Sequence, residues 1–513
     1  MSRLLQNTLL TTAARHPDRT ALIAGDVRMS YQEVKDYACR LAHALRTRGV
    51  RRGDRVAIFM DNTWQCALSI YGVLLADGVF VVINAQTKRD KLAFILGDSN
   101  ARVLLSEPNL LRVFGPVAEQ LPALRVLCAG GIETLSADME SLGNALTDMP
   151  TTPPPQSAIS LDLASLIYTS GSTGEPKGVM HTHQSMLFVL QSLVEYLRLD
   201  GTDRLLCVLP LAFDYGLYQW LMTVYTGAAL VLERSFTYPA QVLNVMETEG
   251  VTVFPGVPTI FAMLLAAHER QPLCFENVRR VTNTAAALPA NFNTRLREIF
   301  PNADIYRMYG LTECKRVSYL PPEQIERKPE SVGIAIPGTE VMVLDDAGQP
   351  VKPGEVGTLY VRGSHVMLGY WNQPEKSAHM LKPGLLPGER LLCTHDLFTV
   401  DEDGYLYFIG RTDDIIKSRG EKISPLEVET VLYGIQGIRE AVVLGIPDLL
   451  LGQAVIAFVS VMENSDLSEG RIKKLCGDKL EAFMVPKYVT ILPELPKSAN
   501  NKTDKKALTT MLS

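Results

Sequence analysis

Apolar and polar positions follow two recurring patterns through most of the chain. Short apolar runs such as 55–60 and 164–168 predict buried strands. A longer stretch with apolar residues at helical spacing, 34–45, predicts a helix with one buried face. Helix and strand patterns then alternate, as in 68–76 with 79–83 and 218–226 with 229–232. This alternation predicts an α/β protein whose parallel or mixed sheets are covered by helices on both faces.

Local signals refine this picture at three places. Ser30 and Glu33 form a plausible capping box at the start of the helix predicted over 34–45. The most apolar stretch, 68–85, contains two glycines and an aspartate, so it predicts a buried helix and strand and not a membrane span. The prolines within 151–155 predict a stiff connector inside a large domain.

A domain boundary is predicted near residue 412. Residues 404–410 resemble a hairpin arm, and the hundred residues that follow have a small α+β pattern. We therefore expect a large domain over 1–412 and a smaller one over 413–513. The predicted elements of the smaller domain are a helix at 425–432, strands at 440–444 and 455–461, and a helix at 469–481.

Composition excludes several classes of protein. The chain has 513 residues, too many for one compact core, and its formal charge of −6 argues against a nucleic-acid-coating protein. Hydrophobic residues at 47% and charged residues at 21% exclude bulk disorder. The eight cysteines are widely spaced with no C-x-x-C pair, and the N-terminus does not resemble a signal peptide. We therefore expect reduced thiols and a cytoplasmic location.

The segment 168–178, YTSGSTGEPKG, is the most informative part of the sequence. Glycines let the main chain approach a ligand closely, and successive amides and hydroxyls can surround phosphate oxygens. Lys177 adds a positive charge. A flexible polar turn is the alternative, but such a turn seldom follows a buried strand directly. The order Lys177–Gly178 excludes a Walker A loop, which needs Ser or Thr after the lysine.

Further motifs follow in order along nearly the whole chain. They are YGLTE at 309–313, THDL at 394–397, GRTD at 410–413, KSRG at 417–420 and Asn501–Lys502. Together with the loop at 168–178 they resemble the AMP-forming adenylating enzymes: acyl-CoA synthetases, adenylation domains of nonribosomal peptide synthesis, and firefly luciferase. Two positions depart from the family pattern, because His395 and Asn501 stand where the family usually has glycine.

The resemblance implies a fold, a reaction and its residues. The implied fold is a large N-terminal domain with a distorted β-barrel subdomain, and a small mobile C-terminal domain. The implied reaction uses ATP and Mg²⁺ to turn a carboxylic acid into an acyl-adenylate. Thr312 and Glu313 would meet the phosphates, Glu313 would hold Mg²⁺, and Lys502 would be the catalytic cation. The implied nucleotide-binding residues are Thr169, Ser170, Gly171, Ser172, Thr173, Gly174, Lys177, Tyr309, Asp396 and Arg411.

Each of these residues also has an ordinary alternative. Tyr309 could be a core tyrosine, and Asp396 with Arg411 could be a plain salt bridge. Lys502 lies in a charged tail, where lysines are normally solvated, so only its position after the other motifs marks it as catalytic.

A second step is implied as well, in which a thiol attacks the adenylate. The resemblance places a hinge at Asp413 and a tunnel for a pantetheine arm at Gly420, where a side chain would narrow the passage. We expect an external acceptor, with a carrier protein that bears phosphopantetheine favoured over CoA. The remote alternatives are a luciferase-like oxidase and a non-catalytic nucleotide binder.

Family spacing also indicates the residues that line the acid pocket. They lie in 213–219, 254–256 and 281–283, at Met308, and in 315–317. The side chains singled out are Phe213, Asp214, Tyr215, Tyr218, Asn283, Met308 and Arg316. The bulky side chains favour a compact acid, aryl or short, over a long fatty chain, although core packing would explain them equally well. Together with the Phe213–Asp214 pair, which resembles that of amino-acid-activating domains, they favour an aryl, amino or amino-aryl acid. Asp214 would either bind a substrate ammonium or pair with Arg316, and the sequence leaves both open.

Overall fold

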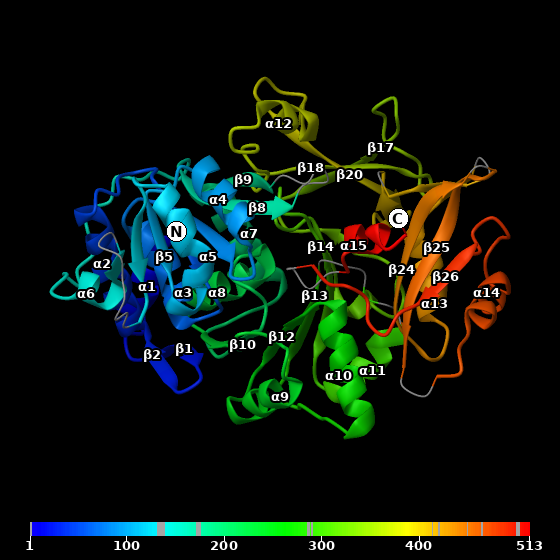
Figure 1. Cartoon of the computed structure of the whole chain (residues 1–513), viewed down its shortest axis with the longest axis horizontal. Helices are drawn as coiled ribbons and strands as arrows, with labels where there is room; N and C mark the ends of the chain where they lie inside the picture. Colours follow the sequence, from blue (N-terminus) through cyan, green and yellow to red (C-terminus); the bar gives the residue numbers. More distant parts are fainter. Residues whose placement is uncertain are drawn as a thin grey trace.

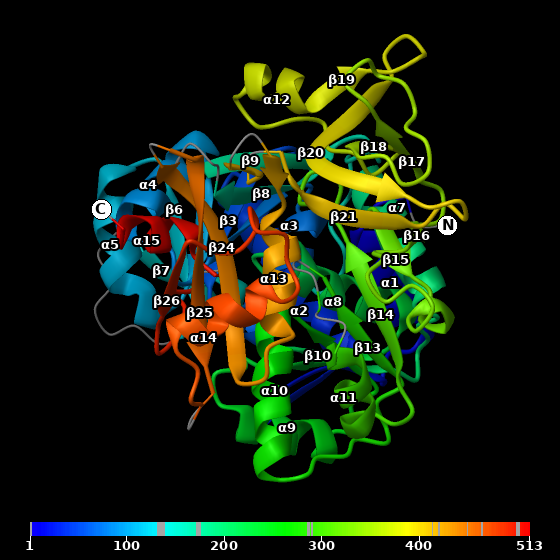
Figure 2. The same ribbon diagram turned by 90° about the vertical axis from the view of Figure 1, so that its right-hand side faces the viewer.

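The computed structural model describes residues 3–130, 139–170, 176–284, 288, 291–412, 414–418, 421–448, 450–462, 465–498 and 503–512. Four sheets organise the chain. Figure 1 shows two of them, with their helices, in the blue-to-green part, a third in yellow at the top, and a fourth in orange and red at one side. Figure 2 shows the fourth sheet in front of the others. The predicted division into a large and a small α/β unit is therefore visible in the fold.

The first sheet has seven strands in the order β7-β6-β5-β3-β4-β8-β9, parallel except for the antiparallel pair β8–β9. Its strands are β3 (Arg55–Met60), β4 (Val79–Asn84), β5 (Val103–Ser106), β6 (Arg125–Cys128), β7 (Met139–Ser141), β8 (Leu163–Ser170) and β9 (Pro176–Thr182). The helices along this part are α2 (Tyr31–Thr47), α3 (Trp64–Leu75), α4 (Arg89–Asp98), α5 (Leu111–Gln120) and α6 (Leu142–Leu146), with a short 3₁₀ turn η1 (Pro108–Leu110).

The second sheet has nine strands in the order β16-β15-β14-β13-β12-β10-β11-β1-β2. Its strands are β1 (Thr20–Ala24), β2 (Val27–Ser30), β10 (Arg204–Cys207), β11 (Ala229–Leu232), β12 (Val253–Gly256), β13 (Arg280–Asn283), β14 (Asp304–Tyr309), β15 (Ser318–Leu320) and β16 (Ile334–Ala335). The helices are α1 (Gln6–Arg15), α7 (His183–Tyr196), α8 (Asp214–Thr226), α9 (Pro239–Thr248), α10 (Pro258–Arg270) and α11 (Asn291–Ile299), with η2 (Pro322–Gln324).

Helix α8 is the element that ties this core to the site. Every residue from Asp214 to Val224 is buried, whereas a helix at the protein surface buries only one face. Trp220 donates its indole N–H to the carbonyl of Ala67 in α3, so even the polar atom of this buried ring is satisfied. The first two turns of α8 therefore stand in a fixed position, and they carry three of the predicted pocket residues, Asp214, Tyr215 and Tyr218.

The third sheet is antiparallel and has five strands. They are β17 (Glu340–Leu344), β18 (Gly357–Arg362), β19 (Leu381–Pro383), β20 (Arg390–Val400) and β21 (Leu406–Arg411), and α12 (Pro374–Met380) precedes β19. The sheet runs β17-β18-β20-β19, and β21 pairs with β20. Its strand β21 covers most of the hairpin arm predicted over 404–410.

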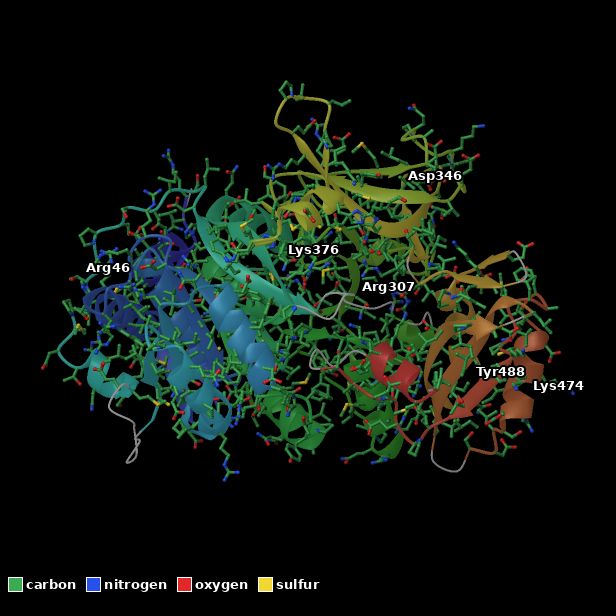
Figure 3. All side chains as sticks on the ribbon, turned by 45° about the horizontal axis from the view of Figure 1, so that its top comes forward. Arg46, Arg307, Asp346, Lys376, Lys474 and Tyr488 are labelled. Atoms are coloured by element: carbon green, nitrogen blue, oxygen red, sulfur yellow. The ribbon has the colours of Figure 1, made fainter. Side chains whose placement is uncertain are left out.

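The fourth sheet and its helices follow residue 415. The strands are β22 (Ile416–Ser418), β23 (Glu421–Ile423), β24 (Ile438–Asp448), β25 (Gly452–Val461) and β26 (Tyr488–Ile491), and the helices are α13 (Pro425–Tyr433), α14 (Glu469–Gly477) and α15 (Lys505–Thr510). The four elements predicted for this region are present, but α14 ends at Gly477 and not at residue 481. Figure 3 shows Lys474 and Tyr488 on the outer side of this unit, away from Arg307 and Lys376.

Other local predictions agree with the structure. Ser30 and Glu33 form both hydrogen bonds of a capping box at α2, and β3 and β11 have the predicted bounds. The apolar stretch at 68–85 is most of α3 followed by β4, and none of the helices in the described ranges is long and apolar enough to cross a bilayer. The eight cysteines are free thiols, and Cys274 alone among them is exposed.

A half-buried carboxyl in α13 makes stability depend on pH. Burial raises the pKa of Glu429 to about 7, while its bond from the Val443 amide opposes the shift. The unfolded value is about 4.3, so the native state holds the proton more tightly, and stability falls as pH rises from about 4 through 7. We expect Glu429→Gln, which keeps the acceptor oxygen, to stabilise the protein by about 1–2 kcal/mol at pH 8 and hardly at all near pH 4.

Urea unfolding at the two pH values measures this difference. Glu494→Gln, at an exposed position, is the matched control and should show no such dependence. An equal effect of Glu429→Gln at both pH values would contradict the assignment.

Candidate active site

Tyr309, Asp396 and Arg411 meet at the junction of the second and third sheets. Tyr309 is the last residue of β14, and its hydroxyl donates a hydrogen bond to Asp396 Oδ2 in β20. Arg411 lies opposite Asp396 in the β20–β21 register, and its Nε is 3.2 Å from Asp396 Oδ1. The Tyr309 ring packs edge-on against Phe398 at 5.0 Å. Three predicted nucleotide-binding residues therefore form one cluster.

The electrostatics of this cluster keep one acceptor available. Burial raises the pKa of Asp396, and the hydrogen bond from Tyr309 and the charge of Arg411 oppose that rise. Burial, and then the charge of Asp396, raises the pKa of Tyr309 well above its usual value, so the phenol stays a donor. Asp396 Oδ1 has no aligned hydrogen bond within the part of the chain that the structure describes. A hydroxyl-bearing ligand would find a buried carboxylate oxygen there.

His395 occupies a backbone position that favours glycine. Its φ is +57°, in the left-handed region, which costs a side-chain-bearing residue roughly 1 kcal/mol. Compensating contacts surround it. Thr412 donates to the His395 carbonyl from its amide and its hydroxyl, and the imidazole stacks on His379 with ring centroids 4.5 Å apart. The departure from the family pattern at 395 therefore leaves the turn before Asp396 intact.

Glu313 and Lys177 are brought together by a tyrosine that the motifs did not include. Tyr370 donates its hydroxyl to Glu313 Oε1 at 2.6 Å, and the Lys177 ammonium lies 5.2 Å from the centre of its ring. Burial and then the charge of Lys376 lower the pKa of Lys177, while Glu313 raises it. Lys376 belongs to α12 and is labelled in Figure 3. A cation and a carboxylate thus face one region beside β9.

Thr312 is held by its main chain. Its carbonyl accepts a hydrogen bond from Nε2 of His181 in β9, at 2.9 Å. Burial lowers the pKa of His181 well below its usual value, so the ring is a neutral donor. This bond fixes the YGLTE segment to the strand that carries Lys177.

The residues after Tyr309 form a tight loop that returns as β15. The amides of Cys314 and Lys315 donate to the Leu311 carbonyl, and Val317 donates to that of Tyr309. Lys315 has φ +68°, and a Cβ on Gly310 would come within 2.3 Å of the Lys315 carbonyl oxygen. Only glycine fits at 310. The loop projects two consecutive cationic side chains toward α8.

Asp214 is paired, but its partner is Lys315 and not the Arg316 considered from the sequence. Lys315 Nζ lies 2.5 Å from Asp214 Oδ1, and both side chains are buried. Burial lowers the pKa of Lys315, and Asp214 opposes the shift. Arg316 instead donates to the Lys315 carbonyl at 2.8 Å and lies over the ring of Tyr215, 5.1 Å from its centre.

The other predicted pocket residues lie on α8 and on the strands and helices packed around it. Phe213 precedes α8 as its N-cap and is half-buried. The Tyr215 hydroxyl bonds to Thr282, next to Asn283 at the end of β13. Tyr218 is fully buried and donates to the Met186 carbonyl, and Met308 accepts a bond from Tyr196. Tyr218 and Met308 thus take part in core packing, and their assignment to the acid pocket stays a prediction.

Two residues of the predicted phosphate loop belong to a described strand, and several other predicted residues lie outside the described ranges. Thr169 lies in β8, in register with Lys177, and Ser170 ends that strand. The residues outside the described ranges are Gly171, Ser172, Thr173, Gly174, Asp413, Gly420, Asn501 and Lys502. Their assignments remain predictions.

Two residues of the site were missed, and a third was given no pairing role. Tyr370 belongs to no motif used above, and His181 resembles any histidine in a strand. Lys315 lies within the predicted lining 315–317, but only Arg316 was considered as the partner of Asp214. For Tyr370 the sequence offered one signal, the preceding glycine Gly369. In the structure this glycine has φ +139°, a main-chain conformation that favours glycine.

Comparison with known families decides the identity. A profile described as AMP-binding enzyme matches residues 9–371, and one described as AMP-binding enzyme C-terminal domain matches residues 427–502. The chain belongs to the AMP-binding enzyme family. The resemblance inferred from the motifs is confirmed, and so is the reaction class of an AMP-forming ligase.

Individual members of the AMP-binding family match end to end or in part. The chain is 32% identical over 494 residues to feruloyl-CoA synthase of Amycolatopsis sp, covering 96% of this chain and 95% of that one. It is 31% identical over 495 residues to tyrocidine synthase 3 of Brevibacillus parabrevis, covering 96% of this chain but 7% of that protein. The crystal structure of the anthranilate CoA ligase AuaEII with anthranoyl-AMP superposes with a TM-score of 0.91 at 29% identity, covering 99% and 97%.

Proposed function

We propose that the protein activates a compact carboxylic acid with ATP and passes the acyl group to a pantetheine thiol. The observation that carries the proposal is the junction where Tyr309, Asp396 and Arg411 meet. Asp396 Oδ1 is a buried acceptor suited to ribose hydroxyls, and Arg411 is a donor beside it. Lys177 lies over the Tyr370 ring and Glu313 accepts from the hydroxyl of that ring, so a phosphate chain here would find a cation and a metal-binding carboxylate.

The first step joins acid and nucleotide. A carboxylate oxygen of the acid attacks the α-phosphorus, the bond from that phosphorus to the bridging oxygen breaks, and pyrophosphate leaves. Two anions approach each other, so aimed positive charge lowers the barrier. We assign that charge to Lys502, with Lys177 at the leaving phosphates. Glu313 would hold Mg²⁺, because this ion usually binds only one or two protein carboxylates together with the phosphates of a substrate. The hydrogen bond from Tyr370 to one oxygen of Glu313 would orient that carboxylate.

The second step releases AMP. The thiolate sulfur attacks the acyl carbon, the bond from that carbon to the phosphate oxygen breaks, and AMP departs with the electron pair. We propose that residues 413–513 move between the two steps about Asp413, and that residues 1–412 bind both substrates throughout.

The acceptor has two candidates. The feruloyl-CoA synthase and the AuaEII ligase match this chain over nearly their whole lengths, and both names specify CoA. These matches favour CoA. A stand-alone carrier protein is the second candidate, because the similarity to tyrocidine synthase 3 extends over almost all of this chain.

The deciding experiment is a screen of acids for ATP–pyrophosphate exchange. Purified protein with Mg²⁺ and labelled pyrophosphate should incorporate label into ATP only when a suitable acid is present. The acceptor is a carrier protein if the enzyme catalyses exchange and loads an added carrier protein but forms no thioester with CoA. No exchange with any acid of a broad library would overturn the proposal.

The thiol route can be tested separately at Gly420. We expect Gly420→Leu to leave pyrophosphate exchange near the wild-type rate and to slow thioester formation by about tenfold, because a side chain would obstruct the pantetheine arm. Gly420→Ala, with a much smaller side chain, is the matched control and should lose less. A normal thioester rate in the leucine variant would refute the tunnel.

A further inference from the structure

Arg316 is a buried guanidinium that lacks a carboxylate partner. Its exposed fraction is 4%, and no acidic side chain of the described residues lies within ion-pair distance. One hydrogen bond runs from Nη1 to the Lys315 carbonyl, and Nε has no acceptor in the described part of the chain. Contact with the face of Tyr215 stabilises a cation only in part. A buried charge normally has an ionic partner, so this one points to a partner that binds.

No neighbouring charged group among the described residues supplies the ionic partner that Arg316 lacks. Asp214 is the nearest acid on α8, and Lys315 already occupies it at 2.5 Å. Glu313, on the other side of the loop, accepts from Tyr370. Burial lowers the pKa of His365, beside this loop, to about 4, so that ring is neutral at physiological pH. Asp214 and Lys315 cancel, and the group formed with Arg316 carries one net positive charge.

A second unsatisfied donor lies on β13, the strand that contacts the tyrosine under Arg316. The Nδ2 amide of Asn283 is buried, with 2% of the residue exposed, and has no hydrogen-bond partner among the residues described. Asn283 follows Thr282, which bonds to the hydroxyl of the tyrosine under Arg316. Both orphaned groups are donors, and a ligand that satisfies them must present acceptor oxygens.

We propose that Arg316, with Asn283, binds a second carboxylate of the acid substrate, so that the enzyme activates a compact dicarboxylic acid. This inference rests on the proposed function, because it concerns the acid of the same reaction. The pair Asp214–Lys315 closes the position at which a substrate ammonium would otherwise bind. The site therefore selects a distal anion and not a distal cation, which excludes the amino acids that the sequence left open.

Arg316 could instead hold the carboxylate that reacts. The two roles predict different patterns across substrates. A residue that binds the reacting group affects every acid alike, whereas a residue that binds the distal group affects only acids that have one. Matched pairs of acids separate these patterns: succinate with butyrate, and benzene-1,3-dicarboxylate with benzoate.

The experiment measures kcat/KM for pyrophosphate exchange with each acid. We expect the wild type to prefer the diacid of at least one pair by about tenfold or more. Arg316→Gln should remove that preference by lowering kcat/KM for the diacid about tenfold to a hundredfold, mainly through KM, with the monoacid changed less than about threefold. Arg316→Lys, which keeps the charge but loses the planar fork, should retain part of the preference.

Three results would overturn the inference. They are a wild-type preference for the monoacid in both pairs, an equal loss for both members of a pair in Arg316→Gln, and a preference that persists in that variant. Should neither variant fold, as judged by circular dichroism, the wild-type preference alone decides.

Calorimetry without ATP separates this inference from the proposed function. The probes are succinate and benzene-1,3-dicarboxylate, each titrated into wild type and into Arg316→Lys. Weaker binding to the variant supports the distal site even if exchange fails, in which case only the proposed reaction falls. No binding of either diacid to the wild type, together with no exchange for any acid of the broad library, overturns both.

Discussion

Replacing Lys315 with methionine is expected to destabilise the large unit by about 3–5 kcal/mol. The methionine fills nearly the same space but leaves the Asp214 carboxylate buried without its cation, and that carboxylate must then be protonated or desolvated alone. Thermal unfolding should shift down by roughly 4–6 °C, because an unfolding entropy of about 2.1 cal/mol/K per residue over about 400 residues corresponds to about 1.2 °C per kcal/mol. Differential scanning calorimetry measures the shift.

The matched control removes both charges. Lys315→Met with Asp214→Leu should recover most of the lost stability, because an apolar pair of similar volume replaces a buried ion pair at little cost. The double-mutant cycle then gives a coupling energy well above that of a surface pair. If the single and double variants are equally destabilised, the lysine stabilises the loop through its own packing and not through Asp214.

The same pair bears on the substrate. Asp214→Ala should raise KM sharply for an acid only if that acid carries an amine. Since Lys315 holds the carboxylate, we expect amino acids to be poor substrates of the wild type, and the exchange screen tests this directly.

Sequence patterns predicted the elements better than the contacts between them. Strand β11 and the capping box of α2 depend on local signals, namely a short apolar run and a Ser-x-x-Glu spacing, and both are present as predicted. Helix α14 ends earlier than predicted because the chain turns after Gly477 and Leu480 contacts the core from outside the helix. A helical period alone does not contain that information.

The choice between Lys315 and Arg316 shows where prediction from spacing fails. Which of two adjacent side chains reaches Asp214 depends on the sign of one φ angle, and Lys315 adopts +68°, a conformation rare for lysine. Spacing along the chain predicted the right loop but not its internal turn. The junction of Tyr309 with Asp396 was reachable only through the family resemblance, because 87 residues separate them and neither pattern nor charge indicates the contact.

Lys502→Ala is expected to slow adenylate formation by about 10²–10³-fold. Lys502 lies outside the described residues, so this prediction rests on its place in the family motif. A described residue close by is informative: Lys505, three residues on, pairs with Asp414 at 2.7 Å, beside the proposed hinge. The last residues of the chain are thus anchored close to Arg411, although Lys502 itself must still reach the α-phosphate.

The two half-reactions separate a catalytic role from a structural one. Pyrophosphate exchange should fall in Lys502→Ala, whereas thiolysis of a pre-formed acyl-adenylate should keep its wild-type rate, because that step needs no cation between acid and phosphate. Lys505→Ala is the matched control: it removes a nearby lysine and its ion pair with Asp414, and it should affect exchange far less. Equal losses in both half-reactions would show that Lys502 acts on the position of the small unit as a whole. A loss confined to exchange makes it the cation that the first step requires.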